Sequence, residues 1–405
     1  MKRNLAVKVL ALALMTLVFP QWTMAQDAQD AEQINANLPE KGKLYLAPIP
    51  VLASNPAFGF VYGAAASGGI FFGDPQATRM SSALLTATYS TKNQLMFTFK
   101  PIVYTNNDDW NLLGDYRVFF SSQNTYGLGT GAPATPIDDY LGEQPMDFDL
   151  IRLHQTALRK IKPNLYAGMG YHLDVFSNID DTMLDEEGQR IETDHDRYSK
   201  EKGFETDGYT ISGVSANLIY DSRDNVANPY SGRYAFLSYK MNAEFLGSTK
   251  GSSTLWMEYR DYFSVSKKNP RNLIALWTYG HFVTSGDVPY MALPSIGWDQ
   301  MGRSGRAFPQ GRFRGENIYY LEAEYRFGIP VVRKNPDLLG GVIFANTTST
   351  SSAMDEVKLF QEMQVAVGAG LRVMINKKAR TNLAIDYGRS FNGEGAVYIG
   401  LTEYF

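Results

Sequence analysis

WDQMGRSGRAFPQGRFRGENIYYLEAEYRF, residues Trp298 to Phe327, contains the strongest indication of the fold. Its first half is rich in Gly and Arg and includes one Pro, so it is predicted to be a loop. From Ile318 onward the side chains alternate between an apolar and a polar face, which is the period of a β-strand. The apolar face consists of Tyr319, Leu321, Ala323, Tyr325 and Phe327, and the polar face of Tyr320, Glu322, Glu324 and Arg326.

The charges on one face of this strand indicate the class of β-protein. A soluble sandwich has an apolar inner face, whereas a membrane barrel turns apolar side chains to lipid and polar side chains to its lumen. We therefore predict an all-β protein, a transmembrane antiparallel β-barrel. The Gly/Arg-rich loop is predicted to fold inward and pair with carboxylates of the lumen, and an ordinary solvated surface loop is the alternative.

The same segment resembles a known family. Residues 310–317 (QGRFRGEN) and the EYRF strand after them resemble the sixth surface loop and next strand of the BamA/TamA superfamily of outer-membrane assembly barrels, also called the bacterial surface antigen family. The resemblance places the loop tip at Arg306, Ala307 and Phe308. The family has Gly where this chain has Ala307, which puts the tight backbone of the tip in question.

Three other motifs extend the resemblance through the C-terminal half. Residues 221–225 (DSRDN) resemble a periplasmic turn of the family, residues 341–346 its thirteenth strand and residues 368–372 its fourteenth. The family's Phe-x-Asp in the thirteenth strand is Phe-Ala-Asn here and ends at Asn346. Gly368 and Gly370 are expected on the inward face, where they either let the loop approach the wall or ease strand curvature.

The resemblance also implies an anchor for the loop tip. In the family the tip Arg is held inside the barrel by an acidic residue of a neighbouring strand, and the candidates by position are Glu324 and Asn346. Because Asn346 carries no charge and an unpaired buried Arg is costly, a further carboxylate is expected nearby. Glu322 and Asp386 are the candidates for that carboxylate.

The chain begins like an exported protein. Lys2 and Arg3 precede an apolar run from Leu5 to Phe19, and the sequence turns polar after Ala25, which is typical of a cleaved signal peptide. A transmembrane helix is the alternative, but the run is short for one. We predict a signal peptide over 1–25, a flexible periplasmic leader over 26–43 and an outer-membrane barrel over 44–405. A leader of this length has no room for the periplasmic domains usual in the family.

The composition agrees with an outer-membrane location. The chain has 0 Cys, which argues against a small disulfide-bonded extracellular domain. Aromatic residues make up 13% of the chain while its mean hydropathy is -0.25, and alternating strands with aromatic girdles produce this combination. The net charge of -4 gives no indication of a nucleic-acid partner.

Period-two segments recur along the chain and predict about 16 strands, since bacterial barrels have even strand numbers. The predicted strands are residues 44–54, 58–72, 80–90, 94–104, 110–124, 147–161, 164–177, 209–220, 234–245, 254–266, 273–285, 318–327, 338–347, 361–376, 381–391 and 396–405. The segments 125–146 and 178–207 are predicted to be long loops.

The first strand is the weakest of these predictions because Pro48 and Pro50 interrupt it, and Pro pairs poorly within a sheet. The seam between the first and last strands is therefore predicted to be the weak point of the barrel, near Val51 on one side and Ile399 on the other. The chain ends on Phe405, and a terminal aromatic on the last strand resembles the assembly signal of outer-membrane barrels.

Catalytic and metal-binding patterns are sparse. The chain has 4 His, and no Ser lies near His154 in the sequence, so we expect no enzyme activity, and no cofactor is indicated. Asp194, His195 and Asp196 in the acidic loop could hold a divalent cation, but they lack EF-hand spacing, and a solvated loop is the simpler interpretation.

Two function classes remain open. The first is an assembly or translocation barrel of the BamA/TamA type, whose seam opens to pair with a client strand. The second is a passive channel or structural barrel without assembly activity. In either case the expected location is the outer membrane of a Gram-negative cell. The expected partners are outer-membrane lipid and lipopolysaccharide, with client barrel proteins or accessory envelope proteins in the first class, and no nucleic acid.

Overall fold

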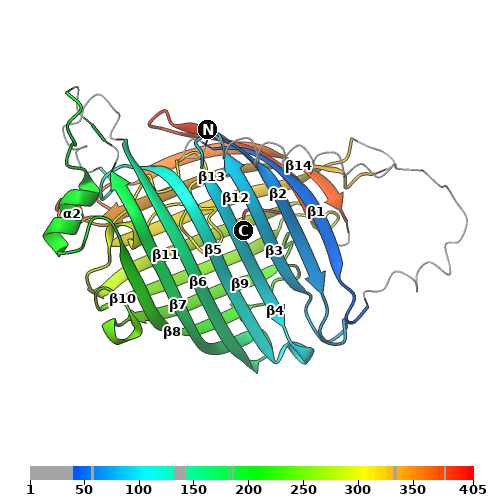
Figure 1. The fold of residues 1–405 in the computed structure, drawn as a ribbon. Helices are drawn as coiled ribbons and strands as arrows, with labels where there is room; N and C mark the ends of the chain where they lie inside the picture. The colour runs from blue at the N-terminus through cyan, green and yellow to red at the C-terminus, as the bar shows by residue number, and fades with distance from the viewer. Residues whose placement is uncertain are drawn as a thin grey trace, which may run out of the picture.

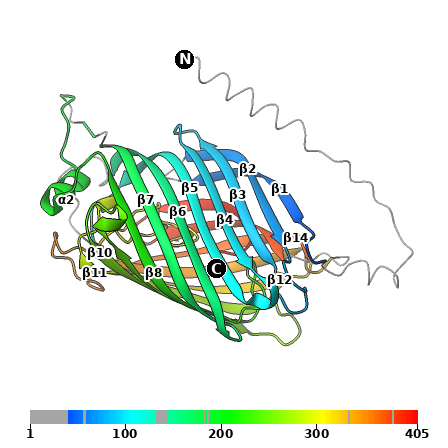
Figure 2. The same cartoon turned by 60° about the horizontal axis from the view of Figure 1, so that its bottom comes forward.

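The computed structural model describes residues 40–55, 59–131, 143–181, 183–184, 187–331, 335–377 and 380–405. The predicted signal peptide and most of the predicted leader lie outside the described residues. The described chain forms one antiparallel sheet of 16 strands in sequence order, which curls into a barrel (Figures 1 and 2).

The strand bounds lie close to the predicted ones, because period-two alternation marks each strand. The strands are β1 (Tyr45–Asn55), β2 (Gly59–Ile70), β3 (Ser81–Ser90), β4 (Leu95–Tyr104), β5 (Trp110–Thr125), β6 (Gln144–Lys162), β7 (Leu165–Asp181), β8 (Tyr209–Asp221), β9 (Gly232–Asn242), β10 (Ser252–Ser264), β11 (Leu273–Gly286), β12 (Asn317–Ile329), β13 (Leu339–Ser351), β14 (Gln364–Asn376), β15 (Thr381–Ser390) and β16 (Gly395–Leu401).

Strand β12 has the two faces that its sequence predicts. Glu322, Glu324 and Arg326 are buried in the lumen, whereas Ala323 and Tyr325 on the other face are exposed. The same alternation leaves large apolar side chains of other strands on the outer surface, among them Phe97 and Phe99 of β4 and Val118 and Phe120 of β5. An apolar exterior around a charged interior is the pattern of a barrel in a membrane.

One element was missed by the sequence analysis. Helix α2 (Asp194–Lys202) lies within the segment predicted to be a loop. Thr193 caps its first turn by accepting a hydrogen bond from the Asp196 amide, and Gly203 ends it in the left-handed conformation. No helix among the described residues is long and apolar enough to cross a membrane.

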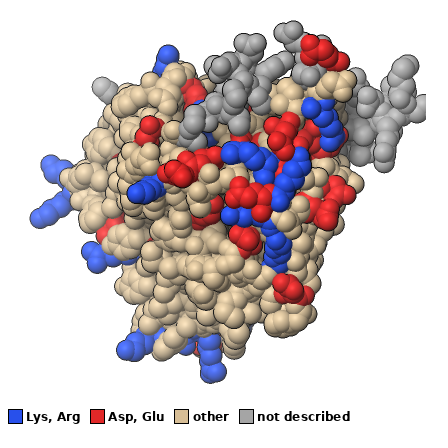
Figure 3. All heavy atoms as spheres, turned by 90° about the vertical axis from the view of Figure 1, so that its left-hand side faces the viewer, with Lys and Arg blue, Asp and Glu red and all other residues tan. Residues whose placement is uncertain are grey.

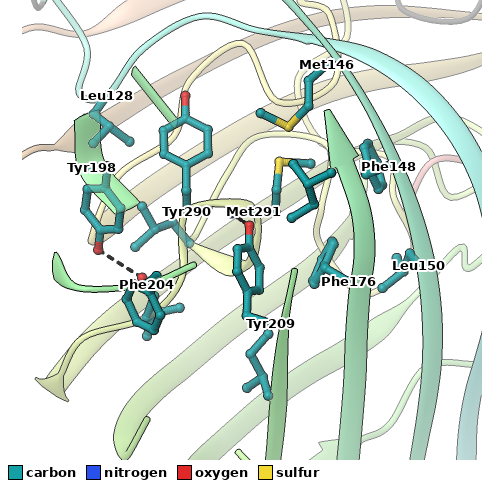
Figure 4. Close-up of a cluster of buried hydrophobic side chains, with 14 residues drawn as sticks. Leu128, Met146, Phe148, Leu150, Phe176, Tyr198, Phe204, Tyr209, Tyr290 and Met291 are labelled. Atoms are coloured by element: carbon teal, nitrogen blue, oxygen red, sulfur yellow. Dashed lines mark hydrogen bonds between the residues drawn. The ribbon is translucent and has the colours of Figure 1, made fainter. Parts of the chain in front are cut away.

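The connections differ in length at the two ends of the barrel. The end that carries α2 has the longer loops, including 182–208 and 287–316, and in outer-membrane barrels the longer loops face outside. Acidic and basic side chains gather in one patch on that side of the molecule (Figure 3). Beneath α2, a buried apolar cluster joins the loops to the barrel wall, with Tyr198 of α2 and Tyr290 of the 287–316 loop among its members (Figure 4).

The last strand ends earlier than predicted, at Leu401 rather than Phe405. Thr402 has φ +67°, a left-handed conformation that breaks the extended strand. The four residues after Leu401 turn into the barrel, where the Glu403 amide donates to the Ala227 carbonyl at 3.2 Å. We refer to residues 402–405 as the C-terminal tail.

Candidate functional site

Within the loop 287–316, a tight turn at Asp299 precedes the tip. The Asp299 carboxylate accepts hydrogen bonds from the amides of Met301, Arg303 and Ser304, at 3.0, 2.9 and 2.7 Å. A short acidic side chain that binds nearby amides in this way is a common means of stabilising a turn. The turn leads the chain to the predicted tip residues Arg306, Ala307 and Phe308, all of which are buried.

Arg306 lies at the centre of the site, and its side chain is 0% exposed. Its guanidinium binds the carboxylates of Glu322 and Glu324 on β12 and, at 2.7 Å, that of Asp386 on β15. The guanidinium also stacks on the ring of Phe344, 3.6 Å from the ring centroid. A planar group with five donors can satisfy several carboxylates at once, which a Lys ammonium could not do in this geometry.

Asn346, the other predicted anchor, plays a different part. Its amide nitrogen donates to the Arg306 backbone carbonyl at 2.9 Å, so it holds the backbone of the tip rather than the charge. The structure therefore brings together all four predicted anchor residues, with three carboxylates on the guanidinium and one amide on the main chain.

The ion pairs continue beyond Arg306 through two arginines, Arg326 and Arg372, whose part in the network the sequence analysis did not predict. Arg326 binds Glu324 at 2.6 Å, and Arg372 binds both Asp386 and, at 2.7 Å, Glu403 of the C-terminal tail. Three guanidinium groups thus share four carboxylates inside the barrel. Networks of this kind position their members tightly, because removing any one of them leaves buried charge unpaired.

Ala307 keeps the backbone conformation that the family's Gly would favour. Its φ is +99°, a region that L-residues with a Cβ rarely occupy. Its amide donates to the Tyr398 hydroxyl of β16, which in turn donates to the Phe308 carbonyl. The tip therefore touches the last strand directly.

Gly388 on β15 lets the loop tip pack closely against the barrel wall, because it has no side chain. A Cβ at this position would lie 3.0 Å from the Ala307 nitrogen and 3.1 Å from the Ala307 Cβ. The two glycines singled out from the sequence make room for other side chains instead. A Cβ on Gly368 would overlap the Phe344 ring, and one on Gly370 would overlap the Asp386 carboxylate that binds Arg306.

The first and last strands lie close together without a ladder. Cα atoms of β1 and β16 come within 8 Å, yet over the described residues β1 pairs only with β2 and β16 only with β15. Pro48 and Pro50 are exposed on β1, Val51 is partly buried, and Ile399 on β16 is exposed.

Phe405, predicted to end the last strand at the seam, lies instead inside the barrel. Its ring packs 5.3 Å from that of Trp277, and Arg326 donates to its carbonyl at 2.9 Å. The turn at Thr402 removes the tail from the sheet, and no period-two pattern could have indicated that turn.

The other predicted polar groups are distributed differently from the sequence expectation. Asp194 is buried and accepts hydrogen bonds from Arg197 at 2.7 Å and from Gln144 at 2.6 Å. His172 meets Ser215 of β8 at 2.7 Å, a neighbour that local sequence could not reveal. Ser215 also accepts from Asn217 at 2.7 Å and is buried, so it forms part of the lumen's polar filling.

Comparison with known proteins places this arrangement in a family. A family model described as the Omp85 superfamily domain matches residues 71–397. Among solved structures, the chain is similar to BamA from Haemophilus ducreyi lacking POTRA domains 1–3, with a TM-score of 0.57 and 14% identity, over 90% of this chain and 70% of that one. It is also similar to CdiB from Acinetobacter baumannii, with a TM-score of 0.52 and 13% identity, over 88% of this chain and 59% of that one. A comparison with curated protein sequences gave no match.

Proposed function

This chain belongs to the Omp85 superfamily, and from that membership we propose that it helps insert or translocate proteins at the outer membrane through a lateral seam between β1 and β16. Omp85 barrels are outer-membrane proteins, so the chain is an integral barrel of that membrane. We further propose that residues 1–25 are a signal peptide that directs export and is then cleaved. We also propose that the host is a Gram-negative cell.

The observation that carries the proposal is the pair of neighbouring strands that share no ladder. Each of β1 and β16 has one edge without hydrogen-bonded partners among the described residues. An unpaired strand edge is a template for another strand, which pairs with it through main-chain hydrogen bonds. A client strand could therefore add to this seam without first breaking an existing ladder.

The sequence of the two strands keeps the seam weak. Pro48 and Pro50 have no amide hydrogen to donate, so a ladder across the seam would lack donors on β1. In addition, β16 has only 7 residues against 11 in β1, because the tail leaves the sheet at Thr402. Both features lower the cost of opening the seam relative to any other strand pair.

A passive channel or structural barrel is the second candidate. The loop tip and the C-terminal tail occupy the lumen and are held there by buried ion pairs. Ions could pass through the lumen only if the loop tip and the tail moved. The arrangement therefore favours a gated or closed lumen over an open pore. No enzyme activity or cofactor is proposed. The partners we propose are outer-membrane lipid, lipopolysaccharide and client or accessory envelope proteins.

A disulfide across the seam tests the function. The chain has 0 Cys, so pairs of cysteines can be placed on β1 at Tyr45 or Val51 and on β16 at Val397 or Ile399 without background. The pair that forms the disulfide best is then used in native membranes, where growth and outer-membrane protein levels are measured. Loss of function on oxidation, with recovery on reduction, is the expected result.

The control is a disulfide within the sheet. Ile385 and Ile399 are direct neighbours in the β15–β16 ladder, which need not open, so a disulfide between them should leave function intact. If the seam disulfide forms efficiently and function persists, lateral opening is wrong and a closed barrel is indicated. Equal loss with both disulfides would also count against the seam, because the effect would then come from general rigidity.

A further inference from the structure

Three side chains converge where helix α2 meets the barrel rim. Asp181 is the last residue of β7, and His195 and Asp196 lie in the first turn of α2. One nitrogen or oxygen atom from each of the three lies within 4.8 Å of the others, the spacing of ligands around one metal ion. His195 Nδ1 is turned toward Asp181, 2.8 Å from Oδ2.

The carboxylates of the cluster differ from the neighbouring Asp194 in their ion pairs. Among the described residues, no Lys or Arg forms an ion pair with Asp181 or Asp196, whereas Arg197 of the same helix binds Asp194 and Asp355. Asp181 and Asp196 bring two carboxylates close together in this cluster, and like charges at such a distance oppose each other.

A second observation concerns the hydrogen-bond partners of Asp181. The Asp181 side chain is only 4% exposed, and its Oδ1 atom is buried with no hydrogen-bond partner among the residues that the structure describes. A buried carboxylate oxygen without a partner is costly, and a bound cation removes that cost. The cluster also borders a pocket of about 800 Å³ that is lined by Asp181, Asp196 and four further aspartates, which gives a cation a path from outside.

We propose that Asp181, His195 and Asp196 bind one divalent transition-metal ion of the zinc class. Two carboxylates and one imidazole are ligands that zinc accepts, and a water molecule from the pocket can take the fourth position. Calcium prefers six to eight oxygen ligands and does not favour imidazole, so it fits this set less well. When the ion binds, it displaces the proton of the hydrogen bond between His195 and Asp181, and this proton is released to water.

The bound ion would hold helix α2 in place against the inward-folded loop 287–316. Helix α2 packs on the loop 287–316, where the Tyr198 hydroxyl donates to the Val288 carbonyl at 2.9 Å (Figure 4). That loop continues to the tip at Arg306. A metal ion bound by residues of both α2 and β7 therefore fixes α2 in its position against the loop 287–316, whose tip lies in the lumen. This inference does not depend on the proposed seam function.

Metal titration of the folded barrel in detergent tests the site, with a purification tag that contains no histidine. Cobalt(II) is the probe, because its visible absorption reports a tetrahedral site, and zinc is then added in competition. We expect one cobalt(II) ion per chain, displaced by zinc. Asp181→Asn and Asp196→Asn should each weaken binding at least about 10-fold, since even residues that only support metal ligands have effects of that size.

Asp180→Asn is the matched control, since it removes the same charge from the neighbouring residue, whose carboxylate pairs with the exposed Arg190. It should bind cobalt(II) as the wild type does. Heat-modifiable migration on gels establishes that each variant is folded. Zinc should also slow trypsin cleavage at Lys200 in the wild type and not in Asp196→Asn. A folded wild type that binds neither cobalt(II) nor zinc would overturn the proposal, as would undiminished binding in both ligand variants.

Discussion

At Arg306 a single side chain decides whether buried charge in the lumen is balanced. Its guanidinium lies among the carboxylates of Glu322, Glu324 and Asp386, all 0% exposed. Without it, Arg326 and Arg372 would have to balance the remaining acids alone. The cost of removing a buried partner arises mainly from the unpaired charges that stay behind in the protein interior.

Arg306→Ala should therefore destabilise the barrel by about 3–5 kcal/mol. The measurement is the temperature at which the folded gel band converts to the unfolded one, combined with denaturant unfolding. Arg312→Ala is the control, since its pair with Glu394 is partly exposed and should contribute at most about 1 kcal/mol. Equal stability of Arg306→Ala and the wild type would show that the tip is not anchored by charge.

Ala307 and Gly388 form a second pair whose effects should depend on each other. Ala307→Gly is expected to stabilise by about 1 kcal/mol, because Gly adopts φ +99° without strain. Gly388→Ala should destabilise, since its Cβ would press on Ala307, and the double variant should recover part of the loss. Gly400→Ala, with open space around its Cβ, is the control. Strict additivity in the double-mutant cycle would mean that the two residues do not interact.

At the scale of elements, the strands were predictable and their exceptions were not. The period-two alternation of residues 318–327 correctly predicted that this segment is a strand and that Glu322 and Glu324 point into the lumen. Helix α2 was missed because its capping residues, Thr193 and Gly203, lie in a segment dominated by Asp and Glu with no apolar periodicity. The partners of Arg306 on β15, and the room that Gly388 provides, depend on pairing between distant strands, and one sequence does not specify that pairing residue by residue.

The side chain of Glu403 is the acidic group that joins the C-terminal tail to the ion-pair network. Glu403 binds Arg372 at 2.7 Å and Asn382 at 2.6 Å, and these hydrogen bonds keep Phe405 inside the barrel. Glu403→Gln should release the tail and speed carboxypeptidase digestion of Phe405 by roughly 10-fold, the effect of losing a charged hydrogen bond. Mass spectrometry of the intact chain measures this. Glu394→Gln, on an exposed turn, should digest at the wild-type rate, and the same rate in Glu403→Gln would refute the role of this ion pair.

For the whole molecule, the sheet encloses a lumen that the chain itself occupies. The loop 287–316 enters from the end with the longer loops, and the tail enters near the turn at Ala227. Both are joined to the wall by the same network, because Asp386 binds Arg306 as well as Arg372, which holds Glu403. A change at either end is therefore transmitted to the other through buried ion pairs, so the barrel should open or stay closed as one unit.

This coupling predicts the electrical behaviour of the barrel. The wild type should conduct weakly in planar bilayers, and replacement of residues 302–312 by a short Gly-Ser linker should raise the conductance several-fold. Removing Arg306 leaves four carboxylates against Arg326 and Arg372, so the opened lumen should prefer cations, as shown by the reversal potential in a salt gradient. Adding Glu322→Gln to this variant should weaken the preference. Shortening the exposed segment 358–363 is the control and should change neither quantity. A variant that folds, as judged by its gel migration, yet conducts no more than the wild type would show that the loop does not close the lumen.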